Sequence, residues 1–239
     1  WEYFSRNRWS FYNRTQTTQF KNDDVTTWDL QTLLTKMSSL YDASVSQEDS
    51  LKKTSVKIFD DVLTKGFMSE VYRPTLYDFL ANRALKFYMN QETEVNKPAQ
   101  QFTFDIKNAL APAPFFAEAK FTSTDSASNL LKAAKLFQKL ILFHFETANK
   151  DALVDVDLRR LNFMKQNCLD ENADSIYKVQ LNMLKTQFSF DSCCAQVMLH
   201  LAYAYAGSAG KYNPLISDRH KWDNTIAIDQ CETIANKFP

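Results

Sequence analysis

Residues 130–146 read LLKAAKLFQKLILFHFE, and their apolar side chains recur three or four positions apart. Leu130, Ala134, Phe137, Ile141 and Phe145 would lie along one face of an α-helix, which has 3.6 residues per turn. Because the same spacing recurs along the chain, we predict a mostly helical protein. The further stripes are Leu30/Leu33/Leu34/Met37/Leu40/Tyr41, Leu51/Ser55/Ile58/Val62, Leu76/Phe79/Leu80/Ala84/Phe87/Tyr88, Val154/Leu158/Leu161/Met164, Tyr177/Leu181/Leu184/Phe188, Ala195/Leu199/Ala202/Ala206 and Ala227/Cys231/Ile234/Phe238.

Glycine is the most informative count in the composition. The chain has only 3 glycines, Gly66, Gly207 and Gly210, where about 7% of residues is usual. Tight hairpin turns and phosphate-binding loops depend on glycine, because it adopts positive φ angles at little cost. No G-x-G-x-x-G or G-x-x-x-x-G-K-[ST] motif is present, which excludes the Rossmann and P-loop classes. We predict an all-α fold of helical hairpins.

Composition and charge limit the classes of partner that the chain can bind. With 45% hydrophobic and 14% aromatic residues, the chain can bury a substantial core. Its 28 basic and 28 acidic residues cancel, so the basic excess typical of proteins that bind nucleic acid or anionic lipid is missing. No apolar run approaches the length of about 18 residues that a transmembrane helix needs. We expect no nucleic-acid partner and no membrane contact by this chain.

The chain divides into three predicted parts: an N-terminal helical region over residues 1–97, a proline-containing extended connector over 98–125, and tetratricopeptide-like helical hairpins over 126–239. In the connector, residues 101–106 alternate with period two, and Pro112 and Pro114 are expected to break any helix. Any strand should lie within about residues 101–121. The connector should pack the aromatic side chains of Phe102, Phe104, Phe115, Phe116 and Phe121.

Two C-terminal stretches resemble tetratricopeptide-type repeats, which place small residues where partner helices approach closely. One leads from residues 190–192 into the stripe of Ala195, and the other ends in Phe238-Pro239. Such hairpins form α-solenoids and commonly bind partners. Helix N-caps are predicted at Asp151, Asp174, Ser192 and Asp223, and Pro74 is predicted at a first helical position.

No catalytic, cofactor-binding or metal-binding residue is predicted. The three histidines are His144, His200 and His220, and we interpret the first two as core or interface residues. No H-E-x-x-H or C-x-x-C motif supplies zinc ligands, and no G-x-S-x-G motif supplies a nucleophile. We therefore expect no enzyme activity and no bound zinc. The four cysteines, Cys168, Cys193, Cys194 and Cys231, are interpreted as buried small hydrophobes, with disulfide pairing as the minor alternative.

Two acidic pairs also have structural interpretations. Asp155 and Asp157 are two positions apart and would point about 200° apart on a helix, so they cannot share a ligand. We expect them in a first helical turn, with Asp155 pairing with Arg159 and Asp157 with Arg160.

The second acidic pair, at residues 23–24, precedes an apolar stripe and is typical of helix capping, with a calcium site as the minor alternative. The aromatic and basic residues within 1–14 could stack on sugars or bases, but a helix packed against the next domain is the favoured interpretation.

Three runs resemble the N-terminal helical region of large alpha-2-macroglobulin-like proteins of Bacteroidetes. They are DDVTTWDL at 23–30, YRPTLYDFLA at 72–81 and DALVDVDLRRL at 151–161, and the resemblance spans most of the chain. It implies an N-terminal fragment of a cell-envelope protein, periplasmic or membrane-anchored through a segment missing here, with macroglobulin domains downstream. Such proteins resemble protease traps, in which a bait region is cleaved and the protease is then enclosed.

The resemblance implies an endopeptidase inhibitor as the parent, with this chain as a non-catalytic scaffold or protein-interaction module. The expected partners are neighbouring macroglobulin domains of the same chain, and proteases or other envelope proteins. The family's thioester places Gln three residues after Cys, with Glu before the Gln. Cys193 keeps that spacing but lacks the Glu and lies in a predicted helix, so we expect neither thioester nor bait here.

Two other classes are alternatives. A SusD-like glycan-binding lipoprotein is also helical, with tetratricopeptide-type hairpins and many aromatic residues. An enzyme would need a cleft that gathers several ionisable groups with displaced pKa values, and the sequence contains no such set.

Overall fold

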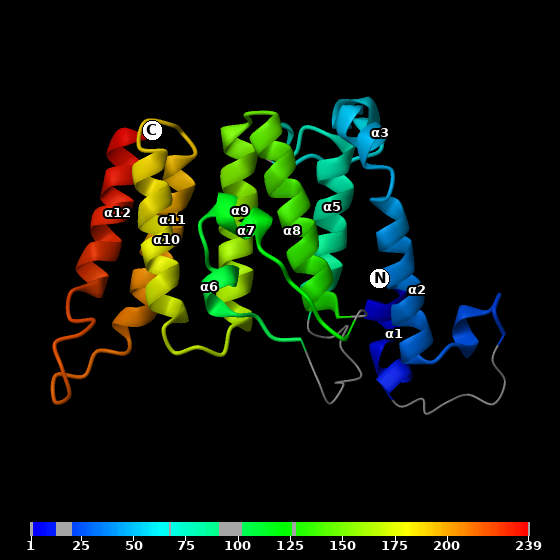
Figure 1. Cartoon of the computed structure of the whole chain (residues 1–239), viewed down its shortest axis with the longest axis horizontal. Coiled ribbons are helices and arrows are strands. Elements are labelled where there is room, and N and C mark those ends of the chain that lie inside the picture. Colours follow the sequence, from blue (N-terminus) through cyan, green and yellow to red (C-terminus); the bar gives the residue numbers. More distant parts are fainter. Residues whose placement is uncertain (1, 13–20, 67, 91–101, 126–127, 239) are drawn as a thin grey trace. The chain divides into compact units, whose positions relative to one another are not determined.

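The computed structural model describes residues 2–12, 21–66, 68–90, 102–125 and 128–238. These residues form twelve α-helices and two 3-10 helices, with two isolated β-bridges and no β-strand among them (Figure 1). The all-α prediction is confirmed. The chain forms two compact units, with Trp1–Phe102 and Ser123–Ala133 in unit 1 and Thr103–Thr122 and Ala134–Pro239 in unit 2.

Unit 1 contains the helices of the N-terminal half. Their bounds are α1 Glu2–Tyr12, η1 Val25–Thr27, α2 Leu30–Ser44, α3 Glu48–Lys53, η2 Val56–Phe59, α4 Ser69–Tyr72 and α5 Leu76–Tyr88, and the unit also holds the first residues of α8, which spans Asn129–Glu146.

Side-chain caps set the helix starts of unit 1. The Asp29 carboxylate caps α2 by accepting from the backbone N–H of Thr32 at 2.7 Å, and Asp24 caps η1 in the same way. The capping interpretation of the run at 23–30 is therefore confirmed. At α5, Thr75 and Asp78 form a reciprocal capping box. Pro74 precedes that cap, so the prediction that it is a first helical residue is wrong.

The apolar stripes predicted for unit 1 are confirmed only in part. Leu30, Leu33, Leu34 and Met37 are buried as predicted, whereas Leu40 is exposed. The stripe at 51–62 is wrong, because residues 56–59 form a 3-10 helix, whose period differs from 3.6, and Ile58 and Val62 are exposed. The helix predicted in the first residues is confirmed as α1, which buries Phe4 and Phe11 and exposes Trp9; Trp1 and Arg14 lie outside the described residues.

Unit 2 contains a series of longer helices. Their bounds are α6 Ile106–Ala109, α7 Ala113–Glu118, α9 Lys150–Asn167, α10 Ala173–Gln187, α11 Cys194–Ala209 and α12 Asp223–Lys237, together with residues 134–146 of α8. Helices α10, α11 and α12 lie side by side (Figure 1), with α11 packed against both neighbours. The helical hairpins are present, while their tetratricopeptide-like character stays a prediction.

The segment predicted as an extended connector contains two short helices, α6 and α7. Pro112 is the N-cap residue of α7, and Pro114 lies in its first turn, where proline is tolerated because its missing N–H has no helical partner. The expectation that these prolines exclude a helix is therefore wrong. Phe104 and Phe116 are buried as predicted, but Phe115 is 69% exposed.

The N-cap predictions of unit 2 are shifted by one or two residues. The N-cap residues are Asn149 for α9, Asn172 for α10, Cys193 for α11 and Trp222 for α12. Asp151, Asp174 and Asp223 lie inside the first turns instead, where a negative charge is favoured by the helix dipole, and Ser192 precedes the cap of α11.

Candidate functional site

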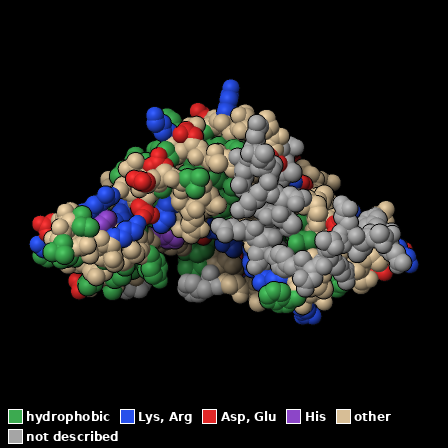
Figure 2. Space-filling view, turned by 90° about the horizontal axis from the view of Figure 1, so that it is seen from below, with side chains coloured by type: hydrophobic (Ala, Val, Ile, Leu, Met, Phe, Trp, Pro, Cys, Tyr) green, Lys and Arg blue, Asp and Glu red, His purple; other side chains and the backbone are tan. Residues whose placement is uncertain are grey.

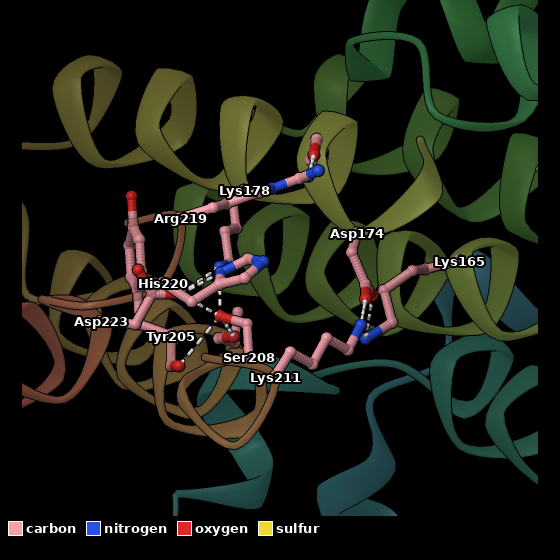
Figure 3. A network of polar contacts seen from close by, with 11 residues as sticks. Lys165, Asp174, Lys178, Tyr205, Ser208, Lys211, Arg219, His220 and Asp223 are labelled. Carbon is pink, nitrogen blue, oxygen red and sulfur yellow. Dashed lines mark hydrogen bonds and ion pairs between the residues drawn. The ribbon is translucent and has the colours of Figure 1, made fainter. Parts of the chain in front are cut away.

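The densest polar network of unit 2 centres on the carboxylate of Asp223, the first residue of α12. Its Oδ2 atom lies 2.8 Å from Nδ1 of His220 and 3.3 Å from Nζ of Lys178, and it accepts a short hydrogen bond from the hydroxyl of Ser208 (Figure 3). Lys178 comes from α10 and Ser208 from α11. One carboxylate therefore joins three helices and the loop before α12.

Ser208 and Lys178 complete this network from within. The Lys178 ammonium donates to the Ser208 hydroxyl and lies 4.3 Å from the ring centroid of Tyr205. Ser208 Oγ also lies 3.1 Å from the carbonyl oxygen of Ala204. A buried charge is tolerated when it is paired and hydrogen-bonded, which fits the 11% exposure of the Asp223 side chain.

A second group of contacts surrounds the first turn of α10. The two carboxylate oxygens of Asp174 lie 2.6 Å from Nζ of Lys211 and 3.3 Å from Nζ of Lys165. The neighbouring Ser175 hydroxyl accepts from Nη2 of Arg219 at 3.2 Å (Figure 3). The loop between α11 and α12 is thereby bound to the start of α10 near both of its ends.

The pKa values of both carboxyls reflect these contacts. Burial alone would raise the pKa of Asp223, but hydrogen bonds from Ser208, His220 and Lys178 outweigh it and lower the pKa below its usual value. The pKa of Asp174 is lowered chiefly by the hydrogen bond from Lys211. Both groups are thus held as carboxylates by their partners.

Serine, histidine and aspartate meet in this network, but in the wrong order for nucleophilic catalysis. In a catalytic triad the histidine lies between the other two and takes the serine proton. Here Asp223 lies between them and binds both Ser208 and His220 directly. Ser208 donates to Asp223 rather than to a histidine, and these contacts join α10, α11 and α12 to one another.

Sequence reasoning recognised only fragments of this network. Helix periodicity predicts Asp174 and Asp223 only as caps and gives His220 no role. Ser208 and Lys178 are 15 and 45 positions from Asp223, and His220, three positions away, lies in a loop that periodicity does not describe. The sequence signals that could have suggested it are Lys178 beside the apolar stripe of α10 and Ser208 among the small residues of α11.

The other histidines lie where they were predicted. His144 is 1% exposed in the core, and His200 is half-buried with Nδ1 at 3.2 Å from the Tyr177 hydroxyl. Burial lowers the pKa of His200 and raises the pKa of Tyr177 to about 12. The core or interface interpretation of both histidines is confirmed.

The four cysteines are free thiols in different environments. Cys193 and Cys194 are buried as predicted, Cys168 is half-buried and Cys231 is exposed, so the interpretation is wrong for the last. Burial raises the pKa of Cys168 and of Cys193 to about 11, which disfavours the reactive thiolate. Cys193 lies at the buried N-terminus of α11.

The predicted pair of Asp157 and Arg160 is confirmed, with 2.6 Å between Oδ1 and Nη2. Asp155 and Asp157 lie in the second turn of α9 rather than in the first, because the helix begins at Lys150. Their charges are therefore too far along the helix for the predicted interaction with its N-terminal dipole.

Three clefts among the described residues are lined by residues outside the network around Asp223. A narrow apolar cleft of about 50 Å³ in unit 2 is lined by residues of α7 to α10 and contains none of the network residues. Unit 1 has a cleft of about 260 Å³, where Lys65 Nζ lies 2.6 Å from Asp60 and 2.5 Å from Glu70. A third cleft of about 210 Å³, also in unit 1, is polar. Its lining residues are Gln31, Leu34, Thr35, Ser38, Ser39, Asp42, Asn129 and Lys132.

Within the described ranges, no three His, Cys, Asp or Glu side chains are grouped so that they could hold a metal ion. None of the helices in the described part of the chain has the length and apolar character needed to cross a membrane.

Comparison of the chain with protein-family models, with curated proteins and with solved structures finds no match in any of the three. Fold and site together define an all-α protein whose clustered polar groups are bonded to one another.

Proposed function

We propose that this chain is a non-catalytic scaffold and protein-interaction module of a large alpha-2-macroglobulin-like envelope protein, whose parent acts as a protease inhibitor. One observation carries the non-catalytic part. Asp223 binds Ser208, His220 and Lys178 at once, so the chemically capable groups gathered around it are engaged in joining helices. A catalytic site would need such groups directed at a substrate.

The interaction part of the proposal is supported by the surface of the last two helices. Tyr203 on α11 is 70% exposed, Ile228 on α12 is 57% exposed, and Trp222 before α12 is 64% exposed. Large apolar side chains that gather on a surface mark contact sites for other proteins. Tyrosine and tryptophan contribute most per residue at such sites.

The parent-level role rests on the resemblance of the runs at 23–30, 72–81 and 151–161. The partners it implies are macroglobulin domains of the same protein, and proteases or other envelope proteins. The location it implies is the cell envelope. Inhibition would reside in a bait region and a thioester outside this chain, while the helices brace neighbouring domains.

The test is to incubate the purified 239-residue chain, and separately the full-length protein, with a panel of endopeptidases. Residual protease activity and covalent adducts are followed together. We expect no inhibition by the chain alone and inhibition by the full-length protein. Stoichiometric inhibition by the chain alone would place the active machinery here and refute the scaffold role, and inhibition by neither would refute the role of the parent.

A SusD-like glycan-binding module is the second candidate, and the polar cleft of unit 1 favours it. Hydroxyls of Thr35, Ser38 and Ser39 line that cleft together with Lys132. Sugars are bound by such hydrogen-bonding groups. A glycan array probed with the wild-type chain and with Ser39→Leu distinguishes the two: a signal that the variant loses supports glycan binding, and a blank array removes it.

A further inference from the structure

The loop between α11 and α12, residues 211–222, exposes three large apolar side chains. Leu215 is 94% exposed, Ile216 is 80% exposed and Trp222 is 64% exposed. Leaving side chains of this size in water forgoes roughly 1.5–3 kcal/mol of burial each. Three exposed apolar side chains within one short loop are typical of a surface that a partner covers.

The tip of this loop is a defined turn. The carbonyl oxygen of Asn213 accepts from the backbone N–H of Ile216 at 3.0 Å and from that of Ser217 at 3.1 Å. The Asn213 side chain accepts from the N–H of Leu215 at 3.0 Å, and Pro214 occupies the second turn position, where its fixed φ angle is favoured. Leu215 and Ile216 therefore project from a preformed turn, which lowers the entropy that binding would cost.

The contacts at the start of α10 and the polar network around Asp223 together hold this loop. Lys211 at its start is bound to Asp174, and Arg219 near its end is bound to Ser175, both on α10. His220 adopts a left-handed backbone conformation, with φ at 69°, and is kept there by Asp223. A strained conformation of this kind persists when the surroundings fix it. The network thus acts as the support of the turn.

The charge of the loop indicates the chemistry of the partner surface that it would bind. Its three basic residues, Lys211, Arg219 and Lys221, outnumber the single acidic Asp218, although the whole chain has a formal net charge of +0. Lys211 and Lys221 are already ion-paired, with Asp174 and Asp218. In the described part of the chain, Arg219 donates to a neutral hydroxyl rather than to a carboxylate. Its positive charge can therefore pair with a carboxylate of a partner. Basic, acidic and apolar side chains lie side by side over α10–α12, at left in Figure 2.

We infer that Leu215 and Ile216 form a docking knob for a partner protein whose surface carries an apolar pocket bordered by carboxylates. The inference rests on the proposed interaction role and names its surface. A membrane fits less well, because lipid-binding segments gather roughly four to eight Lys or Arg residues. Protein hot spots are enriched in tryptophan, tyrosine and arginine, and this loop carries both Trp222 and Arg219.

The experiment selects peptides from a random phage-displayed library on the immobilised 239-residue chain, with a parallel selection on the double variant Leu215→Ser, Ile216→Ser. Enriched peptides are synthesised, and their affinities are measured by calorimetry. We expect sequences that combine Asp or Glu with large apolar residues, and an affinity loss of about tenfold or more in the double variant. Arg219→Glu should weaken binding further at low salt, and Arg219→Lys should restore most of it.

The matched control is Leu169→Ser, because Leu169 is also an exposed loop leucine, at 91%, and lies outside the knob. It should leave the affinities unchanged. Peptides that enrich equally on the double variant would overturn the knob and leave the interaction role in place, and an empty selection would count against both. Sedimentation with phosphatidylglycerol vesicles that depends on Leu215 and Ile216 would overturn the protein partner in favour of a membrane. The protease assay tests the role of the parent independently.

Discussion

Asp157 and Arg160 face each other in the core of unit 2, with 2.6 Å between carboxylate Oδ1 and guanidinium Nη2. Their side chains are 2% and 0% exposed. The other terminal nitrogen of Arg160 donates to the carbonyl oxygens of Ala109 and Ala111, each at 2.8 Å, and the guanidinium lies 4.5 Å from the ring centroid of Phe116. A single side chain of α9 therefore holds the turn between α6 and α7.

The first prediction is that Arg160→Met destabilises unit 2. The change leaves the Asp157 carboxylate buried without its counter-charge and removes the donor to two carbonyl oxygens, which should cost about 3–5 kcal/mol. Chemical denaturation followed by circular dichroism measures the loss. The control is Lys135→Met on the exposed surface of α8, expected within about 0.5 kcal/mol of wild type. A loss below about 1 kcal/mol for Arg160→Met would contradict the structural role.

This ion pair also shows how far sequence reasoning reaches. The spacing of Asp157 and Arg160 on one helix was enough to predict that they meet. Nothing local indicated that the pair is buried or that Arg160 binds Ala109 and Ala111, which are 51 and 49 residues away. Contacts of that separation depend on how α6 and α7 pack against α9.

The second prediction concerns Ala148, which follows α8 in the left-handed conformation with φ at 54°. Glycine adopts this conformation without steric cost and is the preferred residue after a helix C-terminus. We expect Ala148→Gly to stabilise the protein by about 0.5–1 kcal/mol in thermal or chemical unfolding.

The same substitution inside a helix is the control for that prediction. Ala206→Gly, at an exposed position of α11, should destabilise by about 1 kcal/mol. If both variants moved stability in the same direction, backbone conformation would not explain the effect at Ala148.

Helix α11 shows why the buried face was only partly predictable. The stripe of Ala195, Leu199, Ala202 and Ala206 has helical spacing, yet Leu199 is 41% exposed while the neighbouring Val197, Met198 and Leu201 are buried. A helix that is apolar on several faces fits more than one stripe, so periodicity cannot choose between them. Packing against both α10 and α12 selects the face.

The third prediction is a pH dependence of stability from His200. Burial lowers its folded-state pKa below 6.5, so between that lowered value and about pH 6.5 the unfolded state binds a proton that the folded state does not. The contribution of His200 to the free energy of unfolding is therefore fully present above about pH 6.5. It decreases as the pH drops below that value, by at most about 1.4 kcal/mol per pH unit.

Denaturation of wild type and of His200→Gln between pH 8 and pH 5 isolates this effect, because other titrating groups cancel in the difference. Wild type should lose more stability than the variant toward pH 5. Parallel curves would show that His200 is not buried in the neutral form.

The fourth prediction is that Asp223→Asn releases the loop at residues 211–222. The neutral amide is a weaker acceptor for Ser208, His220 and Lys178, and it leaves the Lys178 charge poorly compensated. We expect a loss of about 1.5–3 kcal/mol and faster amide hydrogen exchange across the loop.

The matched control for the loop is Asp218→Asn, because the Asp218 side chain is 80% exposed and its ion pair with Lys221 lies at the surface. That variant should stay within about 0.5 kcal/mol of wild type, since exposed ion pairs contribute little. Unchanged exchange in the loop of Asp223→Asn would mean that the network does not support it.

The fifth prediction concerns the thiols. Cys231 is the exposed cysteine of α12, whereas burial raises the pKa of Cys168 and of Cys193 to about 11 and also raises that of Cys194. Because the thiolate is the reactive form, native protein at pH 7.5 should react with a thiol reagent at Cys231 first and at the other three far more slowly.

Ellman's reagent counts the reactive thiols, and mass spectrometry identifies which cysteines have reacted. The native chain should release the equivalent of one thiol in the fast phase, and the unfolded chain should release all four. Cys231→Ser should remove the fast phase and leave the slow one. A fast phase that survives in Cys231→Ser would contradict the prediction, and mass spectrometry would show whether it comes from the half-buried Cys168 or from opening of α11 at Cys193 and Cys194. Fewer than four thiols after unfolding without reductant would restore the disulfide interpretation that the structure argues against, because all four cysteines are free in it.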